Sequence, residues 1–194
     1  LGIDIVIHSV TKYLNGHSDV VVGVVCSSKA MIKKIFEQEY MILGAIVSPS
    51  DAALVIRGLR TLPLRMQRSF ESCQKVVAFL ESHPKVEKLI YPFAKSFPQY
   101  ELAQRQMRGA GGLFSILLKV DQIEQVEAFF DRLQHFSFAV SWGGHESLVL
   151  PFCALYNIPG RDAPSIPWNL LRFYIGLEDP DWLIADLAQA LEVL

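Results

Sequence analysis

The segment at residues 5–19 reads IVIHSVTKYLNGHSD, and it decides how the rest of the chain is interpreted. It begins as an Ile- and Val-rich run that is typical of a buried strand, and it changes abruptly to Ser9, Thr11 and Lys12. A lysine at the end of a buried strand costs free energy because its ammonium group loses contact with water. The pattern therefore predicts a functional amine at Lys12, and the alternative is a surface lysine in a turn after the strand.

The spacing of two hydroxyl groups favours one kind of chemistry for that amine. Ser9 and Thr11 precede Lys12 by three residues and one residue, so a turn would bring both hydroxyls to one anion. Pyridoxal phosphate needs an amine for its Schiff base and hydrogen-bond donors for its phosphate group. The motif Ser-x-Thr-Lys thus predicts a pyridoxal phosphate site, but the motif is short and does not decide the question alone.

The composition of the 194 residues narrows the class of protein. The chain is 51% hydrophobic and 20% charged with a net charge of -2, which gives ample core material and no electrostatic argument for binding nucleic acid. No apolar run approaches the roughly 20 residues that span a bilayer, so no membrane contact is expected. Cys26, Cys73 and Cys153 show no metal-binding spacing, so we expect no metal site and a reduced, cytoplasmic protein.

Apolar periodicity predicts alternating strands and helices along the whole chain. The expected strands lie at residues 3–8, 20–26, 86–91, 113–120, 136–140 and 170–175, and the expected helices at 29–43, 50–82, 99–107, 123–133 and 181–194. The uninterrupted apolar runs of the first two strands fit a sheet that is covered on both faces. The later elements fit a small α/β lobe with helices on one face of a mainly antiparallel sheet.

Pro63 marks the expected division of the chain, because proline in a helix interior kinks or interrupts it. We therefore expect one domain at residues 1–62 and a second at residues 63–194. The chain starts at Leu1 within strand-like sequence, which predicts a fragment of a longer protein.

The wider context of Lys12 resembles the cofactor-lysine segment of the pyridoxal phosphate enzymes of cysteine and methionine metabolism, the trans-sulfuration family. Further blocks match in the family's order, namely RGLRTLPLRM at residues 57–66, GGLFS at 111–115, SWGGHESL at 141–148 and LRFYIGLED at 171–179. Because these blocks spread over nearly the whole chain, the resemblance is far more specific than the Ser-x-Thr-Lys motif.

The resemblance implies a role for five residues. Lys12 forms the Schiff base and moves the substrate proton, while Ser9 and Thr11 bind the phosphate. Arg172 grips the α-carboxylate of an amino-acid substrate, and Ser141 lies beside it. An arginine inside the apolar run at residues 170–175 independently calls for an anionic partner. The alternatives are a structural ion pair for Arg172 and an ordinary turn hydroxyl for Ser141.

The resemblance also implies the fold class and the activity. The fold is α/β, with the end of an aspartate aminotransferase-like (fold type I) large domain followed by the small C-terminal lobe. The activity is that of a carbon–sulfur lyase acting on cystathionine or a related sulfur amino acid, closest to cystathionine β-lyase. Cystathionine γ-synthase, γ-lyase and O-acylhomoserine sulfhydrylase stay open, and the family implies a homotetramer of tight dimers.

Two other interpretations stay open. In the first, the chain is a non-catalytic C-terminal assembly module. In the second, it is an unrelated α/β binding protein in which the Ser-x-Thr-Lys motif occurs by chance. Other parts of the family's site are expected before Leu1, so we expect the fragment alone to have little or no activity.

Overall fold

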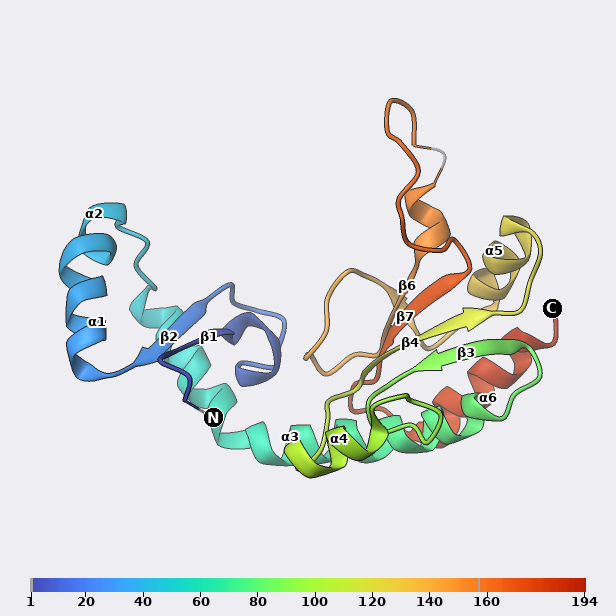
Figure 1. Ribbon diagram of the computed structural model, residues 1–194, viewed down its shortest axis with the longest axis horizontal. Helices are drawn as coiled ribbons and strands as arrows, with labels where there is room; N and C mark the ends of the chain where they lie inside the picture. Colours follow the sequence, from blue (N-terminus) through green and yellow to red (C-terminus); the bar gives the residue numbers. More distant parts are fainter. Residues whose placement is uncertain (1, 157) are drawn as a thin grey trace. The chain divides into compact units, whose positions relative to one another are not determined.

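The computed structural model describes residues 2–156 and 158–194, and the chain divides into two compact units, Leu1–Pro63 and Leu64–Leu194 (Figure 1). The border falls inside helix α3 (Pro49–Glu81), which continues through Pro63 for 33 residues. Of the kink or interruption expected at Pro63, the interruption is therefore wrong. Pro63 has no N–H to donate to the Leu59 carbonyl, so the helix continues without that one hydrogen bond.

The first unit is built around an antiparallel hairpin. Strand β1 (Ile5–Ser9) pairs with β2 (Gly23–Ser27) in a register that sets Ile5 opposite Ser27 and Ser9 opposite Gly23. A π-helical turn, η1 (Val10–Leu14), follows β1 directly. The helix expected at residues 29–43 forms as α1 (Lys29–Ile35), a π-helical stretch η2 (Phe36–Tyr40) and α2 (Met41–Leu43).

The first unit leaves many large apolar side chains in contact with solvent. Ile7, Val21, Ile42 and Leu43 are between 74% and 92% exposed. The described residues of this unit therefore do not form the expected layers on both faces of the strands. A two-stranded sheet with so much exposed apolar surface does not make a stable core by itself.

The second unit contains a five-stranded sheet in the order β3-β4-β7-β6-β5. All neighbouring strands run antiparallel except β5 and β6, which confirms the expected mainly antiparallel sheet. The strands are β3 (Val86–Ile90), β4 (Leu113–Leu118), β5 (Ser137–Phe138), β6 (Leu148–Pro151) and β7 (Leu170–Tyr174). The remaining helices are α4 (Tyr100–Gln106), α5 (Ile123–Arg132) and α6 (Pro180–Leu191), with a short 3-10 turn η3 (Phe152–Leu155).

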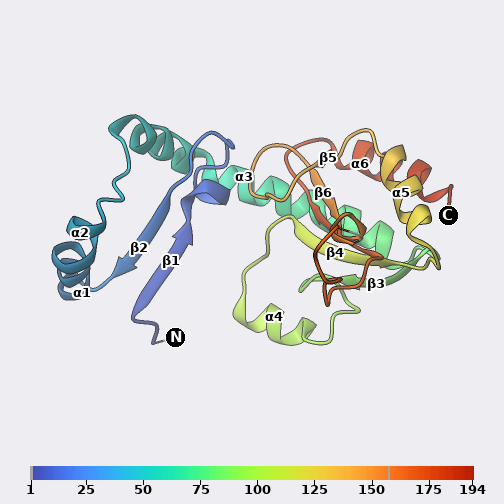
Figure 2. The same ribbon diagram turned by 90° about the horizontal axis from the view of Figure 1, so that it is seen from above.

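The core of this unit lies between the sheet and helices α3, α5 and α6, which Figure 2 shows beside the strands. Alternate residues of β4 are buried, and Phe114 of β4 stacks on Phe173 of β7 with ring centroids 5.4 Å apart. Side chains alternate between the two faces of a strand. Arg172, the neighbour of Phe173, therefore points to the other face, where Ser115 is its partner in the register.

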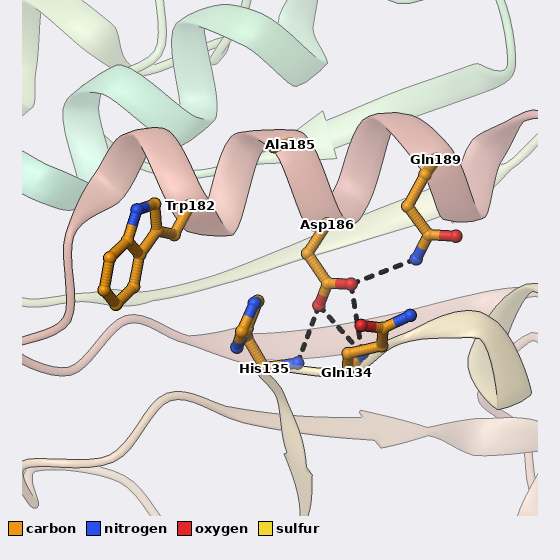
Figure 3. Close-up of a pocket in the computed structure, with 6 residues that line it drawn as sticks. All are labelled: Gln134, His135, Trp182, Ala185, Asp186 and Gln189. Carbon is orange, nitrogen blue, oxygen red and sulfur yellow. Dashed lines mark hydrogen bonds between the residues drawn. The ribbon is translucent and has the colours of Figure 1, made fainter.

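A buried carboxylate fastens α6 to the turn after α5. Asp186 is 4% exposed and accepts hydrogen bonds from the backbone N–H groups of Gln134 at 3.0 Å and His135 at 2.8 Å. Gln189 Nε2 also donates to Asp186 at 3.0 Å. These groups line a surface hollow of about 390 Å³ beside the exposed Trp182 ring (Figure 3). Since its hydrogen bonds are all internal, Asp186 acts as a structural tie.

Replacing Asp186 by alanine is expected to destabilise the protein by about 2 to 3 kcal/mol, because backbone donors in the α5–α6 contact lose a charged acceptor. Urea unfolding followed by tryptophan fluorescence measures the effect. The matched control is Asp131→Ala on the exposed face of α5, which should change the free energy of unfolding by less than about 0.5 kcal/mol. Equal unfolding midpoints for the two variants would contradict the structural role of Asp186.

Candidate functional site

Lys12 lies in the η1 turn that follows strand β1. The turn is π-helical, but Lys12 itself has non-helical backbone angles, with φ -86° and ψ -129°. Its side chain is half-buried, whereas Ser9 at the end of β1 is exposed. The structure therefore places the three predicted cofactor residues, Ser9, Thr11 and Lys12, on one short stretch of the first unit.

The Thr11 hydroxyl fastens this turn to the segment that leads into β2. The Val22 N–H donates to Thr11 Oγ1 at 2.9 Å, and Thr11 Oγ1 donates to the Val22 carbonyl at 3.3 Å. The same carbonyl accepts hydrogen bonds from the N–H groups of Val10 at 2.8 Å and Thr11 at 3.1 Å. Because two stronger donors already satisfy the Val22 carbonyl, the Thr11 proton can turn to another acceptor at little cost.

The chemistry of this donor set fits pyridoxal phosphate. Ser9 and Thr11 supply hydroxyl donors for a phosphate oxygen, and Lys12 supplies a primary amine for the aldehyde. All three come from the end of one strand and the turn after it. Ser9, Thr11 and Lys12 are therefore the residues of the first unit that would hold the cofactor.

Arg172 forms the second predicted group, on strand β7 of the second unit. One terminal nitrogen of its guanidinium, Nη2, is buried and has no hydrogen-bond partner among the described residues. The guanidinium carbon lies 5.5 Å from the centre of the Trp142 ring, and burial lowers the pKa of Arg172 from its ordinary value. The described part of the chain shows no ion pair to Arg172, so the geometry does not favour a structural ion pair.

A buried donor without a partner is costly, and it is best explained by a ligand. A guanidinium fork beside an aromatic ring suits a planar carboxylate, which accepts two parallel hydrogen bonds. Ser141 precedes Trp142 directly in the loop between β5 and β6, so this loop brings Ser141 to the neighbourhood of Arg172. The predicted pair Ser141 and Arg172 therefore belongs to one region of the second unit.

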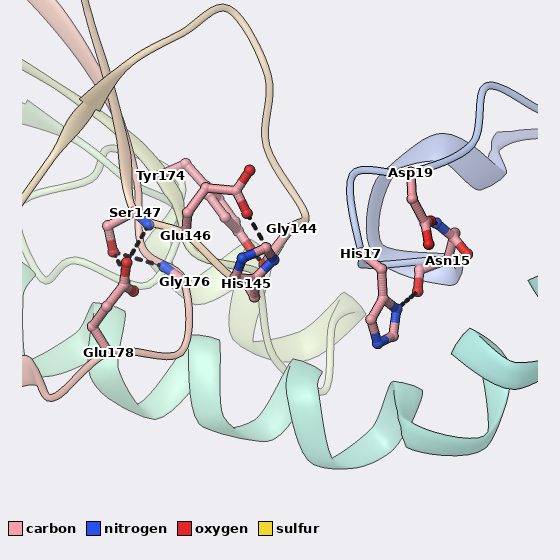
Figure 4. A network of polar contacts seen from close by, with 10 residues as sticks. All are labelled: Asn15, His17, Asp19, Gly144, His145, Glu146, Ser147, Tyr174, Gly176 and Glu178. Carbon is pink, nitrogen blue, oxygen red and sulfur yellow. Dashed lines mark hydrogen bonds and ion pairs between the residues drawn. The ribbon is translucent and has the colours of Figure 1, made fainter. Parts of the chain in front are cut away.

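The loop that carries Ser141 and Trp142 is anchored at its far end by Glu178. The Ser147 N–H and hydroxyl donate to the Glu178 carboxylate at 2.6 Å and 2.7 Å (Figure 4). The Gly176 N–H donates to Ser147 Oγ at 3.0 Å. A Cβ on Gly176 would lie 2.2 Å from the His145 carbonyl oxygen, so only glycine permits this close approach. Sequence reasoning missed Glu178, because its partners lie 31 residues away in the sequence.

Tyr174 ties the same loop to β7 from the face of the sheet that also carries Arg172. Its hydroxyl donates to the Gly144 carbonyl at 2.8 Å, and the side chain is 2% exposed. Burial raises the pKa of Tyr174 to about 12 from its ordinary value of 10.0. The folded protein therefore holds this proton at a pH at which the unfolded chain releases it.

Stability is expected to fall as the pH rises from about 10 to about 12, since the unfolded state ionises first in that window. The rise in the pKa of Tyr174 from 10.0 to about 12 corresponds to roughly 2 to 3 kcal/mol of stability, all of it present below pH 10 and lost by pH 12. Buried Cys73, whose pKa is also raised to about 12, adds to the slope in the same direction. Urea unfolding at several pH values measures the slope. Tyr174→Phe should flatten it, and an unchanged slope in that variant would contradict the assignment.

The described residues support neither a membrane-spanning helix nor a metal site. No helix there combines the length and the apolar character needed to cross a membrane. Within the same residues, no group of three or more His, Cys, Asp or Glu side chains could hold a metal ion.

Comparison with known proteins places these features in a family. The family described as Cys/Met metabolism PLP-dependent enzyme matches residues 1–192. L-methionine gamma-lyase of Pseudomonas deceptionensis is 43% identical over 199 residues, covering 100% of this chain and 50% of that protein. Cystathionine gamma-lyase of Sus scrofa is 44% identical over 196 residues, covering 99% of this chain and 48% of that protein.

A third relative, cystathionine gamma-lyase of Dictyostelium discoideum, is 41% identical over 196 residues, covering 99% of this chain and 50% of that protein. The chain spans about half the length of the curated relatives it matches. Since the family match covers nearly all of the chain, the turn of Lys12 and the strand of Arg172 both fall within it. The chain belongs to the pyridoxal phosphate-dependent enzyme family of cysteine and methionine metabolism, which has the type I fold.

Proposed function

We propose that the protein carrying this chain is a pyridoxal phosphate-dependent lyase that cleaves a carbon–sulfur bond of cystathionine, methionine or a related sulfur amino acid. The observation that carries the proposal is the buried, unpartnered Nη2 of Arg172, within a chain of this family. It calls for an anionic ligand such as the carboxylate of an amino acid. The relatives named as lyases of methionine and cystathionine support the carbon–sulfur chemistry.

Lys12 and the two hydroxyl residues divide the work at the cofactor. Bound pyridoxal phosphate supplies an electron sink for charge that develops at the substrate Cα. Ser9 and Thr11 would hold the phosphate through their hydroxyl protons. Lys12 Nζ would hold the cofactor before substrate arrives and, once released, would take the proton from the substrate Cα.

Arg172 would orient the substrate through its carboxylate. Two parallel hydrogen bonds from one guanidinium fix both the position and the plane of a carboxylate. Trp142 lies against the guanidinium and restricts the plane in which it can rotate. Ser141, next in the chain, would add a hydroxyl donor or acceptor beside that carboxylate.

The bond that is cleaved decides between β- and γ-lyases. Cleavage of cystathionine on the β side leaves a three-carbon fragment that ends as pyruvate, and cleavage on the γ side leaves a four-carbon fragment that ends as 2-oxobutanoate. The resemblance of the sequence motifs predicts a cystathionine β-lyase, whereas the relatives above are named as γ-lyases. The identity of the keto acid therefore distinguishes the two.

The test is an absorption spectrum of the purified protein with pyridoxal phosphate, before and after borohydride, followed by peptide mass mapping. We expect an absorption band near the visible range from the bound cofactor, and borohydride should attach the cofactor covalently to the peptide that contains Lys12. The protein should also release a keto acid from cystathionine or methionine. Attachment to Lys12 without keto acid, but with activity on an O-acylhomoserine, would favour a synthase or sulfhydrylase. No attachment to Lys12 would overturn the proposal in favour of a non-catalytic module.

We also propose a homotetramer located in the cytoplasm, as the resemblance to the family implies. Sedimentation velocity of the purified protein measures the assembly, and a monomer at micromolar concentration would contradict it. Cell fractionation with a tagged chain measures the location, and recovery with membranes would contradict that part.

A further inference from the structure

Asn15 is a fully buried amide in the loop that follows Lys12. It is 0% exposed, and its Nδ2 donates to Asp19 Oδ1 at 2.7 Å. Its Oδ1 is buried and has no hydrogen-bond partner among the described residues. Burying an amide with one unsatisfied oxygen costs about 1 to 3 kcal/mol, so a smaller apolar residue would serve stability better. The free-energy cost of burying Asn15 therefore points to a role for its hydrogen bond to Asp19.

The backbone of Asn15 holds the Lys12 turn at its C-terminal end. The Asn15 N–H donates to the Val10 carbonyl at 2.9 Å, and the Gly16 N–H donates to the Lys12 carbonyl at 2.7 Å. The Asn15 carbonyl accepts a hydrogen bond from His17 Nδ1 at 2.6 Å, which requires the tautomer with its proton on Nδ1 (Figure 4). Lys12 thus lies between two residues that hydrogen bonds hold in place, namely Thr11, which is bonded to Val22, and Asn15, whose N–H is bonded to Val10.

Helix α3 supplies the surface on which this loop rests within the first unit. A Cβ on Gly58 would lie 2.3 Å from the Asn15 carbonyl oxygen and 2.9 Å from its Cα. The neighbouring Arg57 Nη2 lies 3.5 Å from Asp19 Oδ2. The side chains of Arg57 and Asp19 are 62% and 36% exposed. The loop after Lys12 therefore packs backbone against backbone on α3, and Gly58 makes that approach possible.

We infer that Asn15, held by Asp19, is a positioning residue that fixes the Lys12 turn against helix α3. The inference rests on the proposed function, because it assumes that Lys12 is the cofactor lysine. Lys12 has non-helical backbone angles inside the turn, so the ordinary repeat of a helix does not set its direction. The contacts of Thr11 and Asn15 set the direction of Lys12 instead. An error of about 1 Å in such a group costs on the order of 100-fold in rate.

The test compares Asn15→Ala and Asp19→Ala with Asp19→Asn and Arg57→Gln. The first readout is amide hydrogen exchange of peptides from residues 9–19 in the cofactor-free protein, with peptides of β4 and β7 as the internal reference. The second is kcat and KM of the protein loaded with pyridoxal phosphate. Asp19→Asn retains a carbonyl acceptor for Asn15, and Arg57→Gln removes only an exposed charge pair, of the kind that contributes about 1 kcal/mol or less.

We expect Asn15→Ala and Asp19→Ala to speed exchange at residues 9–19 by about tenfold or more while the reference peptides stay unchanged. In the loaded protein, kcat should fall about 10-fold to 100-fold and KM should change less than about threefold. Asp19→Asn should recover most of kcat, and Arg57→Gln should match wild type.

Gly58→Ala provides an independent variant. Alanine is favoured over glycine in a helix by about 1 kcal/mol, yet the close approach to Asn15 predicts faster exchange at residues 9–19 and a lower kcat. Gly23→Ala is the control, since its Cβ would meet only the His8 oxygen at 3.8 Å.

Unchanged kcat in Asn15→Ala and Asp19→Ala would overturn the positioning role, whether or not exchange rises. Loss of kcat in Asp19→Asn to the level of Asp19→Ala would also overturn it. Failure of borohydride to attach the cofactor to Lys12 in wild type would instead overturn the proposed function. The two failures are therefore distinguishable in one set of proteins.

Discussion

Replacing Lys12 by alanine is expected to lower kcat by at least about 1,000-fold in the protein that carries this chain, because the substrate Cα loses its proton acceptor. Pyridoxal phosphate should still bind weakly through the hydroxyls of Ser9 and Thr11. Lys12→Arg should be equally inactive, since a guanidinium keeps the positive charge but neither forms the same bond to the cofactor nor accepts the proton. Keto acid release and borohydride attachment measure the two losses separately.

The control for Lys12 is Lys29→Ala, which removes an exposed lysine at the start of α1 in the same unit. It should retain wild-type turnover and attachment of the cofactor. Substantial turnover in Lys12→Ala would show that another group takes the proton. Attachment of the cofactor to a different peptide in wild type would show that a residue other than Lys12 forms the Schiff base.

Replacing Arg172 by alanine is expected to raise KM and to lower kcat/KM by about 100-fold or more. Two charge-assisted hydrogen bonds to a carboxylate account for a loss of that size. Arg172→Lys should fall between alanine and wild type, because an ammonium keeps the charge but not the planar fork. Steady-state kinetics over a range of substrate concentrations separates KM from kcat.

The Arg172→Ala variant is expected to keep its stability although it loses activity. Because Nη2 is buried without a partner, Arg172→Ala removes an unsatisfied donor and should not lower the midpoint of urea unfolding. Arg132→Ala, at the exposed end of α5, is the control and should leave kcat/KM unchanged. An unchanged kcat/KM in Arg172→Ala would remove Arg172 from the substrate site.

The fold was predictable where apolar periodicity was long and uninterrupted. Helices α5 and α6 and strands β4 and β7 lie where the sequence predicts them, within a few residues at their ends. Strand β6 was missed, because four residues that end in proline give too short a pattern to distinguish a strand from a loop. Helix α3 continues through Pro63 although proline removes one hydrogen bond, and the part of α3 that packs into the core, from Cys73 to Leu80, lies beyond it.

The candidate site was predictable only where single residues carry the chemistry. Lys12 and Arg172 are charged residues in apolar runs, so local sequence singles them out as candidates, while the roles given to them come from the family resemblance and stay predictions. Asn15 and Glu178 act through hydrogen bonds to groups that only the folded chain brings close, such as Ser147 and the backbone beside Gly58. Glycine and asparagine in a loop are typical turn residues, so nothing local distinguishes a close backbone approach from an ordinary turn.

The strand order of the second unit has a consequence for synthesis on the ribosome. Strand β7, made last among the strands, inserts between β4 and β6 at the centre of the sheet. Until residues 170–174 have left the exit tunnel, β4 and β6 each present an open edge to chaperones and to other nascent chains. A ribosome that stalls shortly before β7 therefore displays two unpaired edges, and premature termination there favours aggregation over a partly folded lobe.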